Sequence, residues 1–173
     1  AARQCDDPDV VFMVVGAGAQ RAALEARQEE LQLKNFRLVD KVPKEEVPYL
    51  LACTSASVVH LKASPLFKTV IPSKIFESMV TRTPIVLGVE GESKEIIEES
   101  NAGIPIPPED PGALVDAVLT LKRNTELHSE MGDNGYEHVH RFYDRSKLAR
   151  RYATLLQEVA RLEATTVGTL SMV

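Results

Sequence analysis

Three residues in the segment IPSKIFESM have the types and spacing needed to bind a phosphorylated ligand. Ser73 directly precedes a helix-like run, Lys74 is the first residue of that run, and Glu77 lies about one turn further on. On a helix, Ser73 would occupy the N-cap, Lys74 would stand beside the positive end of the helix dipole, and Glu77 would share a face with both. Backbone N–H groups and Lys74 would then hold a diphosphate, while the Glu77 carboxylate would accept hydrogen bonds from ribose hydroxyls.

The same segment has a simpler explanation from the residues alone. A capped helix with a solvated lysine and a solvated glutamate needs no ligand. A capping box does not account for Glu77, because with Ser73 as the cap the position that should carry glutamate holds Phe76. Both interpretations therefore remain open at this point.

Glycines mark a second candidate site. The apolar, β-branched run Val10 to Gly16 predicts a parallel strand that is buried on both faces, and the sequence GAGAQR follows it. Gly16 and Gly18 would place backbone N–H groups in front of a phosphate or a sugar. The motif lacks the third glycine of GxGxxG, and a tight strand-to-helix turn without a ligand explains it nearly as well.

Other polar residues have ordinary structural explanations. His60 ends a predicted strand and is a candidate acid or base, although a lone histidine is more often structural. Asp7 and Asp9 form a DxD pair, but they precede a strand, so we do not assign them a metal. The remaining histidines are interpreted as surface residues and the acidic cluster as a solvated helix face: His128, His138, His140, Glu92, Glu95, Glu98 and Glu99.

The order of elements predicts the fold class. Strands are expected at 10–16, 36–42, 56–61, 84–88 and 103–106, and helices at 19–33, 43–51, 72–80, 94–100, 111–122, 126–141 and 146–162. Pro48 should shorten or kink the second helix. This alternation predicts an α/β fold with a Rossmann-like, doubly wound parallel sheet, which binds ligands beyond the carboxyl ends of its strands. We expect one domain over 1–163 and a disordered tail over 164–173.

Composition narrows the class of protein. The chain has 173 residues and a net charge of −5, which argues against a nucleic-acid-binding face. No apolar run is long enough for a transmembrane segment. Cys5 and Cys53 form neither a disulfide framework nor a zinc motif, which fits a reduced cytoplasmic compartment. Ala1 to Cys5 reads like the end of a helix, so we expect an upstream segment to be missing.

The order of these motifs resembles the C-terminal, donor-binding domain of family 4 GT-B glycosyltransferases, closest to bacterial members that make surface polysaccharides. The resemblance covers about Val10 to Tyr152 and rests on the strand-GxG unit, NFRLVDKVPKEEVPYLL, PSKIFESM, TPIVLGVEGE and AGIPIPPEDPGAL. It implies one half of a GT-B enzyme that transfers sugar from a nucleoside diphosphate sugar, expected to be UDP-linked, with retention of configuration and without a metal or other cofactor. The acceptor, a glycan or a lipid-linked glycan, would bind mostly to the missing N-terminal domain. The intact enzyme would lie in the cytoplasm or at the cytoplasmic face of the membrane, and this fragment alone would be inactive.

The resemblance also implies residue roles. It places Gly16 and Gly18 at the interdomain cleft, and Lys41 and Val42, in the loop after the second strand, beside the base. Ser73 and Lys74, at the start of the PSK helix, would lie at the diphosphate, and Glu77 would lie at the ribose. Gly91 and Glu92 match a loop that faces the cleft. The last helix resembles one that packs back across the N-terminal domain.

This sequence departs from the family pattern at several points. The first glutamate of the E-x7-E pair, which contacts the sugar, is replaced by Thr69. Arg82 stands where glycine is typical, so the PSK helix should end differently. The arginine and lysine that neutralise the diphosphate in family members would lie upstream of Ala1.

Two other functions share this type of sheet. A stand-alone flavodoxin-like nucleotide-binding or regulatory module would need the same parallel strands, but the acidic pocket of a receiver domain is not seen. A GT-B sugar-nucleotide epimerase would carry additional carboxylates and histidines in its cleft, and a phosphorylase a cofactor lysine.

Overall fold

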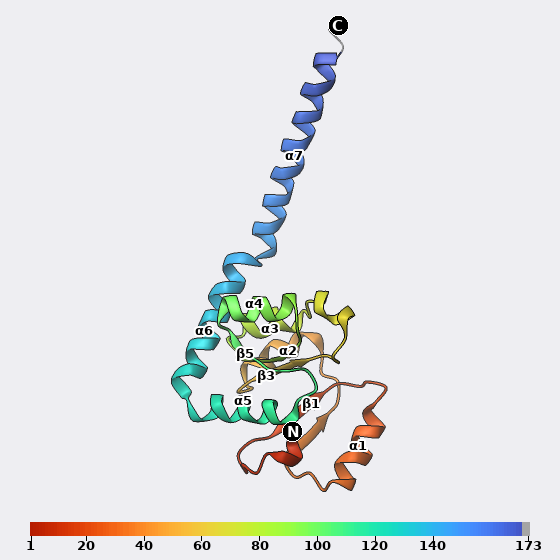
Figure 1. Cartoon of the computed structure of the whole chain (residues 1–173), viewed down its shortest axis with the longest axis vertical. Coiled ribbons are helices and arrows are strands. Elements are labelled where there is room, and N and C mark those ends of the chain that lie inside the picture. Colours follow the sequence, from red (N-terminus) through yellow and green to blue (C-terminus); the bar gives the residue numbers. More distant parts are fainter. Residues whose placement is uncertain (171–173) are drawn as a thin grey trace.

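The computed structural model describes residues 1–170, with side chains up to residue 161. Five short strands form two parallel sheets, and the class predicted from the sequence is confirmed (Figure 1). β1 (Phe12–Val15) pairs with β2 (Phe36–Val39), and β4 (Ile85–Gly88) lies between β3 (Ser57–His60) and β5 (Gly103–Pro105). The predicted single sheet is thus divided, because β1 and β3 do not pair within the described part of the chain.

The helices lie at the predicted places along the chain, but the first two helices are shorter than predicted. They are α1 (Arg21–Glu30), α2 (Val47–Ala52), α3 (Lys74–Val80), α4 (Glu92–Ser100), α5 (Pro111–Arg123), α6 (Thr125–Phe142) and α7 (Arg145–Leu170). Three 3-10 turns add η1 (Ala2–Gln4), η2 (Lys44–Glu46) and η3 (Pro65–Thr69). Pro48 lies in the first turn of α2 and separates it from η2, as its missing N–H group requires.

The core is built around β4, the central strand of the three-stranded sheet. Ile85 and Leu87 are fully buried on the face covered by α3, α4 and α6, where they meet Ile75 and Ile97. Val86 is fully buried on the opposite face, against α5 and the start of α6. Figure 1 shows α3 and α4 on one side of this sheet and α5 on the other. Burial of each such side chain contributes about 2 kcal/mol to stability.

The prediction that β1 is buried on both faces is wrong. Met13 and Val14 point to opposite faces and are 41% and 43% exposed. The apolar run does form a parallel strand, but β1 belongs to a sheet of only two strands, and neither of its faces is fully covered. Periodicity alone could not show this difference.

The β1–β2 pair is attached to the rest of the fold through η1 and α5. Cys5 and Val10 bury their side chains against Val115 of α5. Lys122, near the end of the same helix, pairs with the carboxylates of both Asp7 and Asp9, the latter at 3.1 Å. The DxD pair thus links the turn that follows η1 to α5.

The last helix projects away from the domain. α7 runs from Arg145 to Leu170 and extends well past α6 (Figure 1). We had expected this helix over 146–162 and a disordered tail over 164–173. Residues 164–170 are helical, and residues 171–173 lie outside the described residues. No helix within the described chain is long and apolar enough to cross a membrane.

The Lys122 contacts give a testable prediction for stability. Changing Lys122 to Gln should lower Tm by on the order of 2–4 °C at pH 7, measured by calorimetry, because the change loosens the link between η1 and α5. Lys94→Gln is the control, since Lys94 makes only a local pair with Glu98 within α4. Equal effects of the two variants would contradict the proposed link.

The same link should depend on pH. The hydrogen bond from Lys122 lowers the pKa of Asp7 below its ordinary value of 3.8. A carboxyl group with a lowered folded-state pKa stabilises the fold above its unfolded-state pKa and loses that effect as the pH falls. The Tm difference between wild type and Lys122→Gln should therefore be full at pH 5 and shrink below about pH 3.8.

Candidate functional site

The structure brings Ser73 and Glu77 together on the solvent side of α3. The Ser73 Oγ atom donates a hydrogen bond to Glu77 Oε1 at 3.1 Å, and both residues are exposed. Ser73 is the residue just before the helix, as predicted, but its side chain accepts no bond from a backbone N–H group. The N-cap position is therefore right and the capping bond is wrong, because the hydroxyl is engaged with the carboxylate instead.

Lys74 completes this polar surface. It is the first residue of α3 and is exposed, and within the described chain its side chain has no hydrogen-bond or ion-pair partner. The opposite side of the helix is fixed by Ile75 and Met79, which are 0% and 1% exposed. Because those two side chains anchor α3 in the core, Ser73, Lys74 and Glu77 are held at the surface with little freedom of the backbone.

The end of α3 differs from our expectation. Arg82 adopts the left-handed conformation, with φ 55°, so the helix stops as it would with glycine, and the expectation of a different ending is wrong. A side chain in this conformation costs free energy, and Arg82 has compensating contacts. Its guanidinium pairs with Asp133 and lies 4.0 Å from the ring centre of Tyr136, both on α6.

The loops that follow β3 and β4 contact each other beside this helix through an ion pair and a hydrogen bond. Lys68 Nζ lies 3.0 Å from Glu90 Oε2, and Ser93 Oγ donates to the Val70 carbonyl at 2.8 Å. Gly91, with φ 75°, lies so close that a Cβ atom there would be 2.1 Å from the Lys68 carbonyl oxygen. The loop with Gly91 and Glu92 thus has a packing role whether or not it faces a ligand. Thr69, which replaces the first glutamate, ends η3 within the same fastened region.

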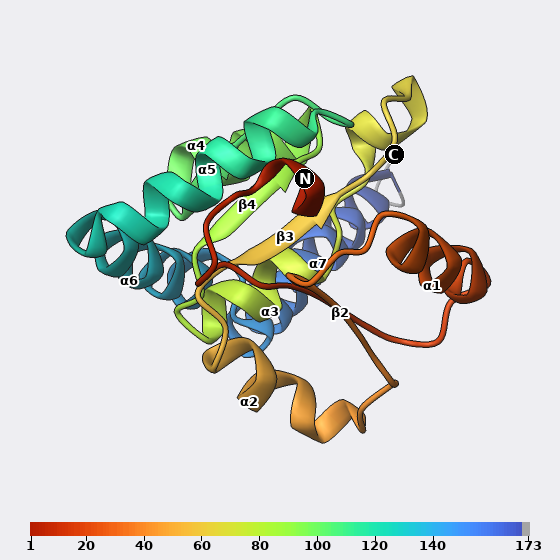
Figure 2. The same ribbon diagram turned by 90° about the horizontal axis from the view of Figure 1, so that it is seen from below.

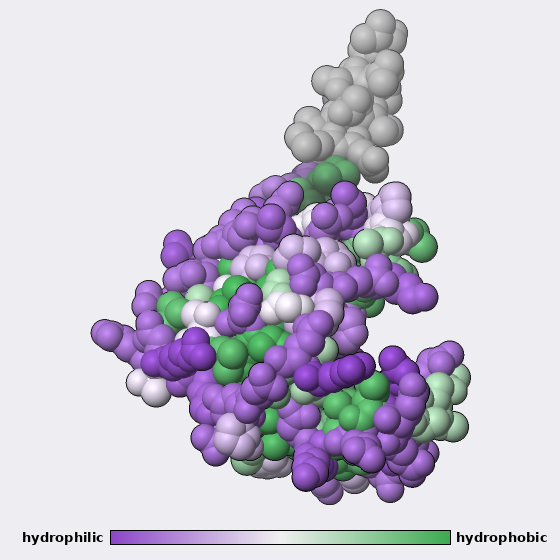
Figure 3. Space-filling model, turned by 60° about the horizontal axis from the view of Figure 1, so that its bottom comes forward, coloured by the Kyte–Doolittle hydropathy of each residue, from purple (hydrophilic) through white to green (hydrophobic). Residues whose placement is uncertain are grey.

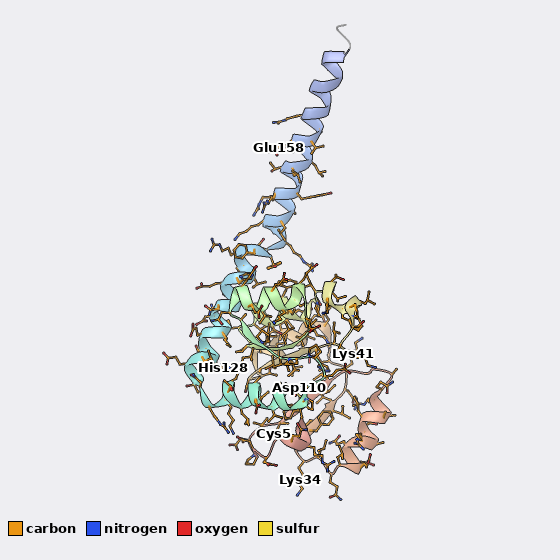
Figure 4. The ribbon with its side chains drawn as sticks, viewed as in Figure 1. Cys5, Lys34, Lys41, Asp110, His128 and Glu158 are labelled. Carbon is orange, nitrogen blue, oxygen red and sulfur yellow. The ribbon has the colours of Figure 1, made fainter. Side chains whose placement is uncertain are left out.

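The second group of predicted residues gathers at the carboxyl ends of β1 and β2. Gly16 has φ 147°, and a Cβ atom at Gly16 or Gly18 would meet no other atom within 4 Å, so space is open in front of both glycines. Lys41 and Val42 follow β2 in an irregular loop. Figure 4 shows Lys41 on the side of the molecule where α1 lies, away from His128.

Arg21 is a residue of this second group that sequence reasoning missed. Its Nη1 atom donates to the carbonyls of Gly16 at 3.0 Å and Val39 at 3.2 Å, and lies 3.0 Å from Asp40 Oδ1. It therefore joins the carboxyl ends of both strands. Its position in the first helical turn after GAGAQ was the available signal, since a long cationic side chain there can reach back to the carbonyl groups at the strand ends.

The two groups of predicted residues remain separate. Ser73, Lys74 and Glu77 belong to a helix packed on the three-stranded sheet, whereas Gly16, Gly18, Lys41 and Val42 belong to the β1–β2 unit. No hydrogen bond or ion pair joins these groups within the described part of the chain. Each group is thus positioned by its own sheet and helices, and a ligand that touches both groups would bridge the two sheets.

The histidines lie outside these groups or have structural partners. His60 is exposed at the end of β3. His128 and His138 are half-buried rather than at the surface as predicted, and His140 is exposed. His128 Nε2 is bonded to the Ser55 carbonyl oxygen at 2.7 Å, and burial lowers the pKa of His138. Glu92, Glu95, Glu98 and Glu99 are all exposed, as expected for a solvated face.

A glycine-ended strand and a polar helix start, both at carboxyl ends of parallel strands, are the features of a Rossmann-like domain, a fold in which ligands generally bind beyond the strand ends. The comparison with known families gives the particular family. Residues 1–138 match the model of the glycosyl transferases group 1 family, and the chain belongs to this family.

Similar proteins agree with this assignment. The chain is 31% identical over 115 residues to a probable glycosyltransferase, WbjE of Pseudomonas aeruginosa, covering 64% of this chain and 28% of WbjE. The crystal structure of Anabaena HepE in complex with UDP-glucose superposes with a TM-score of 0.74 at 21% identity, over 90% of this chain and 43% of that one. The C-terminal domain of LpcC, a group 1 glycosyltransferase from Francisella tularensis, gives 0.66 at 18% identity, over 81% of this chain and 73% of that one.

These structural matches show a fold of the GT-B type, with the parallel strands and helices described above. The chain spans well under half the length of the curated relatives that it matches.

The close approach at Gly91 gives a third prediction. Gly91→Ala should lower the free energy of unfolding by about 3 kcal/mol or more, since the methyl group overlaps the Lys68 carbonyl and the left-handed conformation is strained. Gly18→Ala is the matched control, with open space, and should change stability by less than about 1 kcal/mol. Urea denaturation of both variants measures the difference, and a similar loss in the two would refute the overlap.

Proposed function

We propose that this chain is the donor-binding domain of a retaining glycosyltransferase that uses a UDP-linked sugar. The observation that carries the proposal is the trio Ser73, Lys74 and Glu77, held on the solvent side of α3 in a chain of the group 1 family. The crystal structures of HepE with UDP-glucose and with UDP support a nucleoside diphosphate sugar as the donor.

Each residue of the trio has a chemical role in this proposal. Lys74, which has no partner within the described chain, neutralises the diphosphate. Ser73 donates its hydroxyl hydrogen to Glu77 and keeps that carboxylate in place. Glu77 then uses its remaining acceptor capacity for the ribose hydroxyls, which a carboxylate suits because it offers only acceptors.

The β1–β2 unit completes the donor site. Gly16 and Gly18 leave open space at the end of β1, so a sugar or phosphate can approach their backbone closely. Lys41 and Val42 border the base in the loop after β2. Arg21 keeps the ends of both strands in register, so it acts as a positioning residue for this half of the site.

The reaction proposed for the intact enzyme is transfer of the sugar to a glycan or a lipid-linked acceptor, with the UDP diphosphate as the leaving group. Lys74 and backbone N–H groups stabilise the charge that develops on the leaving diphosphate, so no metal is needed for that purpose. The acceptor binds mostly to a part of the enzyme outside these residues. Because the Thr69 hydroxyl is shorter than a glutamate side chain and uncharged, the contact to the transferred sugar comes from another group in this proposal.

A nucleotide titration tests this proposal. Amide chemical shifts of the isotope-labelled protein should change saturably with UDP, centred on Ser73 to Glu77, and less with GDP or ADP. Lys74→Met should weaken UDP binding by about tenfold and leave uridine unaffected, because uridine has no diphosphate. Glu77→Gln should weaken both UDP and uridine, because the two share the ribose.

The matched controls lie on α4. Lys94→Met and Glu95→Gln change an exposed lysine and an exposed glutamate of similar type and should leave UDP binding as it is. Weakening by these variants equal to that at Lys74 and Glu77 would show a general charge effect and contradict the site. Absence of UDP binding by the intact protein at millimolar concentration would overturn the proposed function.

A further inference from the structure

A small hollow lies at the carboxyl ends of the three-stranded sheet. Its walls come from η3 and the loop before it, from the loop after β4, and from the segment between β5 and α5. The polar residues of its lining are Lys62, Ser64, Lys68 and Glu90. Figure 2 shows η3, in yellow, beyond the tip of the β3 arrow. The hollow is therefore at the edge of the sheet where ligands bind in this class of fold.

Contacts among the three loops hold the walls of this hollow. The Ala63 N–H group donates to Glu109 Oε2 at 3.0 Å, which joins the loop after β3 to the segment after β5. Glu109 has the left-handed conformation, with φ 61°, which is uncommon for a residue with a side chain. The contacts of Gly91 and Ser93 described above hold the loop after β4 against the same region. Side chains on these loops thus meet a ligand with little backbone freedom left to lose.

One ion pair belongs to the lining of the hollow. Lys68 Nζ lies 3.0 Å from Glu90 Oε2, and the two side chains are 53% and 48% exposed. Glu90 is fixed by the buried strand before it, since only Val89, which is 2% exposed, separates it from β4. Within the described chain, Glu90 Oε1 has no hydrogen-bond partner and Lys68 has no second one. An exposed pair of this kind adds little to stability, and it leaves one acceptor atom and further N–H donors for a ligand.

These unused groups suit a sugar better than a phosphate. The charges around the hollow cancel, because Lys62 and Lys68 are balanced by Glu90 and Glu109, so an anion is not attracted. A sugar hydroxyl both donates and accepts hydrogen bonds. One hydroxyl can therefore donate to Glu90 Oε1 while its neighbour accepts from Lys68. Hydrogen bonds to charged groups of this kind are stronger than those between neutral groups.

The hollow is also close in the chain to the start of α3. η3 ends at Thr69, and the three residues 70–72 alone separate it from Ser73. The Thr69 hydroxyl is engaged with the backbone, since it donates to the Leu66 carbonyl at 3.3 Å. In Figure 3 a notch lies between the part where α1 lies and the rest of the molecule, which leaves space for a ligand that reaches across it.

We propose that Glu90 and Lys68 form the subsite for the transferred sugar, and that this sugar is uncharged. Glu90 Oε1 accepts a hydrogen bond from one sugar hydroxyl. Lys68 keeps the Glu90 carboxylate in place and donates to the neighbouring hydroxyl. This inference rests on the proposed function, since the hollow receives the sugar only when Lys74 and Glu77 hold the nucleotide.

Binding of UDP and of UDP-sugars to the intact protein tests the subsite. Calorimetry gives Kd for UDP and for four uncharged donors: UDP-glucose, UDP-galactose and the N-acetylated 2-amino forms of both. Glu90→Gln should weaken the tightest of the four by about tenfold and leave UDP within about twofold, because UDP lacks the transferred sugar. Glu98→Gln is the matched control and should change neither, since Glu98 forms a similarly exposed pair with Lys94 within α4.

Deoxy donors distinguish a contact to the sugar from a role in holding the loops. Analogues of the tightest donor that each lack one hydroxyl are compared on wild type and on Glu90→Gln. One analogue should bind wild type about tenfold more weakly than the parent donor, and this difference should fall below about twofold in the variant. Loss of the loop contact alone would weaken UDP and every analogue together and leave the differences among them unchanged.

The possible failures are distinguishable. Equal weakening of UDP and the UDP-sugar by Glu90→Gln, or no coupling between Glu90 and any hydroxyl, would overturn the subsite and leave the nucleotide site at Lys74 standing. Binding of UDP without binding of any of the four donors at millimolar concentration would overturn it as well. Absence of UDP binding would overturn the proposed function, and the subsite with it.

Discussion

The complete burial of β4 is the constraint on which the candidate site depends. Ile85, Val86 and Leu87 have no exposed surface, so both faces of the strand must be covered by helices. α3 meets this requirement on one face through Ile75 and Met79. Because the helix is anchored by these two side chains, its start lies at the carboxyl edge of the sheet with Lys74 and Glu77 in solvent. The chemistry of the surface is thus positioned by apolar packing beneath it.

Two left-handed residues show how the chain fits around that helix. Gly91 allows the loop after β4 to touch the Lys68 carbonyl, and no residue with a Cβ fits there. Arg82 takes the left-handed conformation at the end of α3, and its contacts with Asp133 and Tyr136 on α6 offset the cost. Arg82 therefore keeps the same left-handed turn that glycine would allow at the end of α3, because its contacts with α6 offset the strain of a side chain in that conformation.

Much of this fold could be predicted from residue patterns, for identifiable reasons. The continuous apolar run of β4, the proline that begins α5 and the alternation of elements are local signals, and the structure follows them. The burial of β1 could not be predicted, because a two-sided apolar strand is buried only when both of its edges and faces find neighbours. The hydrogen bond between Ser73 and Glu77 was also missed. An N-cap serine can either accept a hydrogen bond from a backbone N–H group or donate one to a nearby carboxylate, and only the side-chain positions decide between these two roles.

The division into two sheets affects the candidate site directly. Gly16, Lys41 and Val42 belong to the β1–β2 unit, whereas Lys74 and Glu77 belong to the unit of the three-stranded sheet. The link between these bodies is the first turn of the chain on α5, with one small apolar cluster and the two carboxylates around Lys122. In the proposed donor site, a diphosphate at Lys74 and a base at Val42 would belong to one ligand, so both contacts would require the distance between the two units to be fixed to within about an ångström. Exposed ion pairs and a small cluster are weak restraints for that purpose.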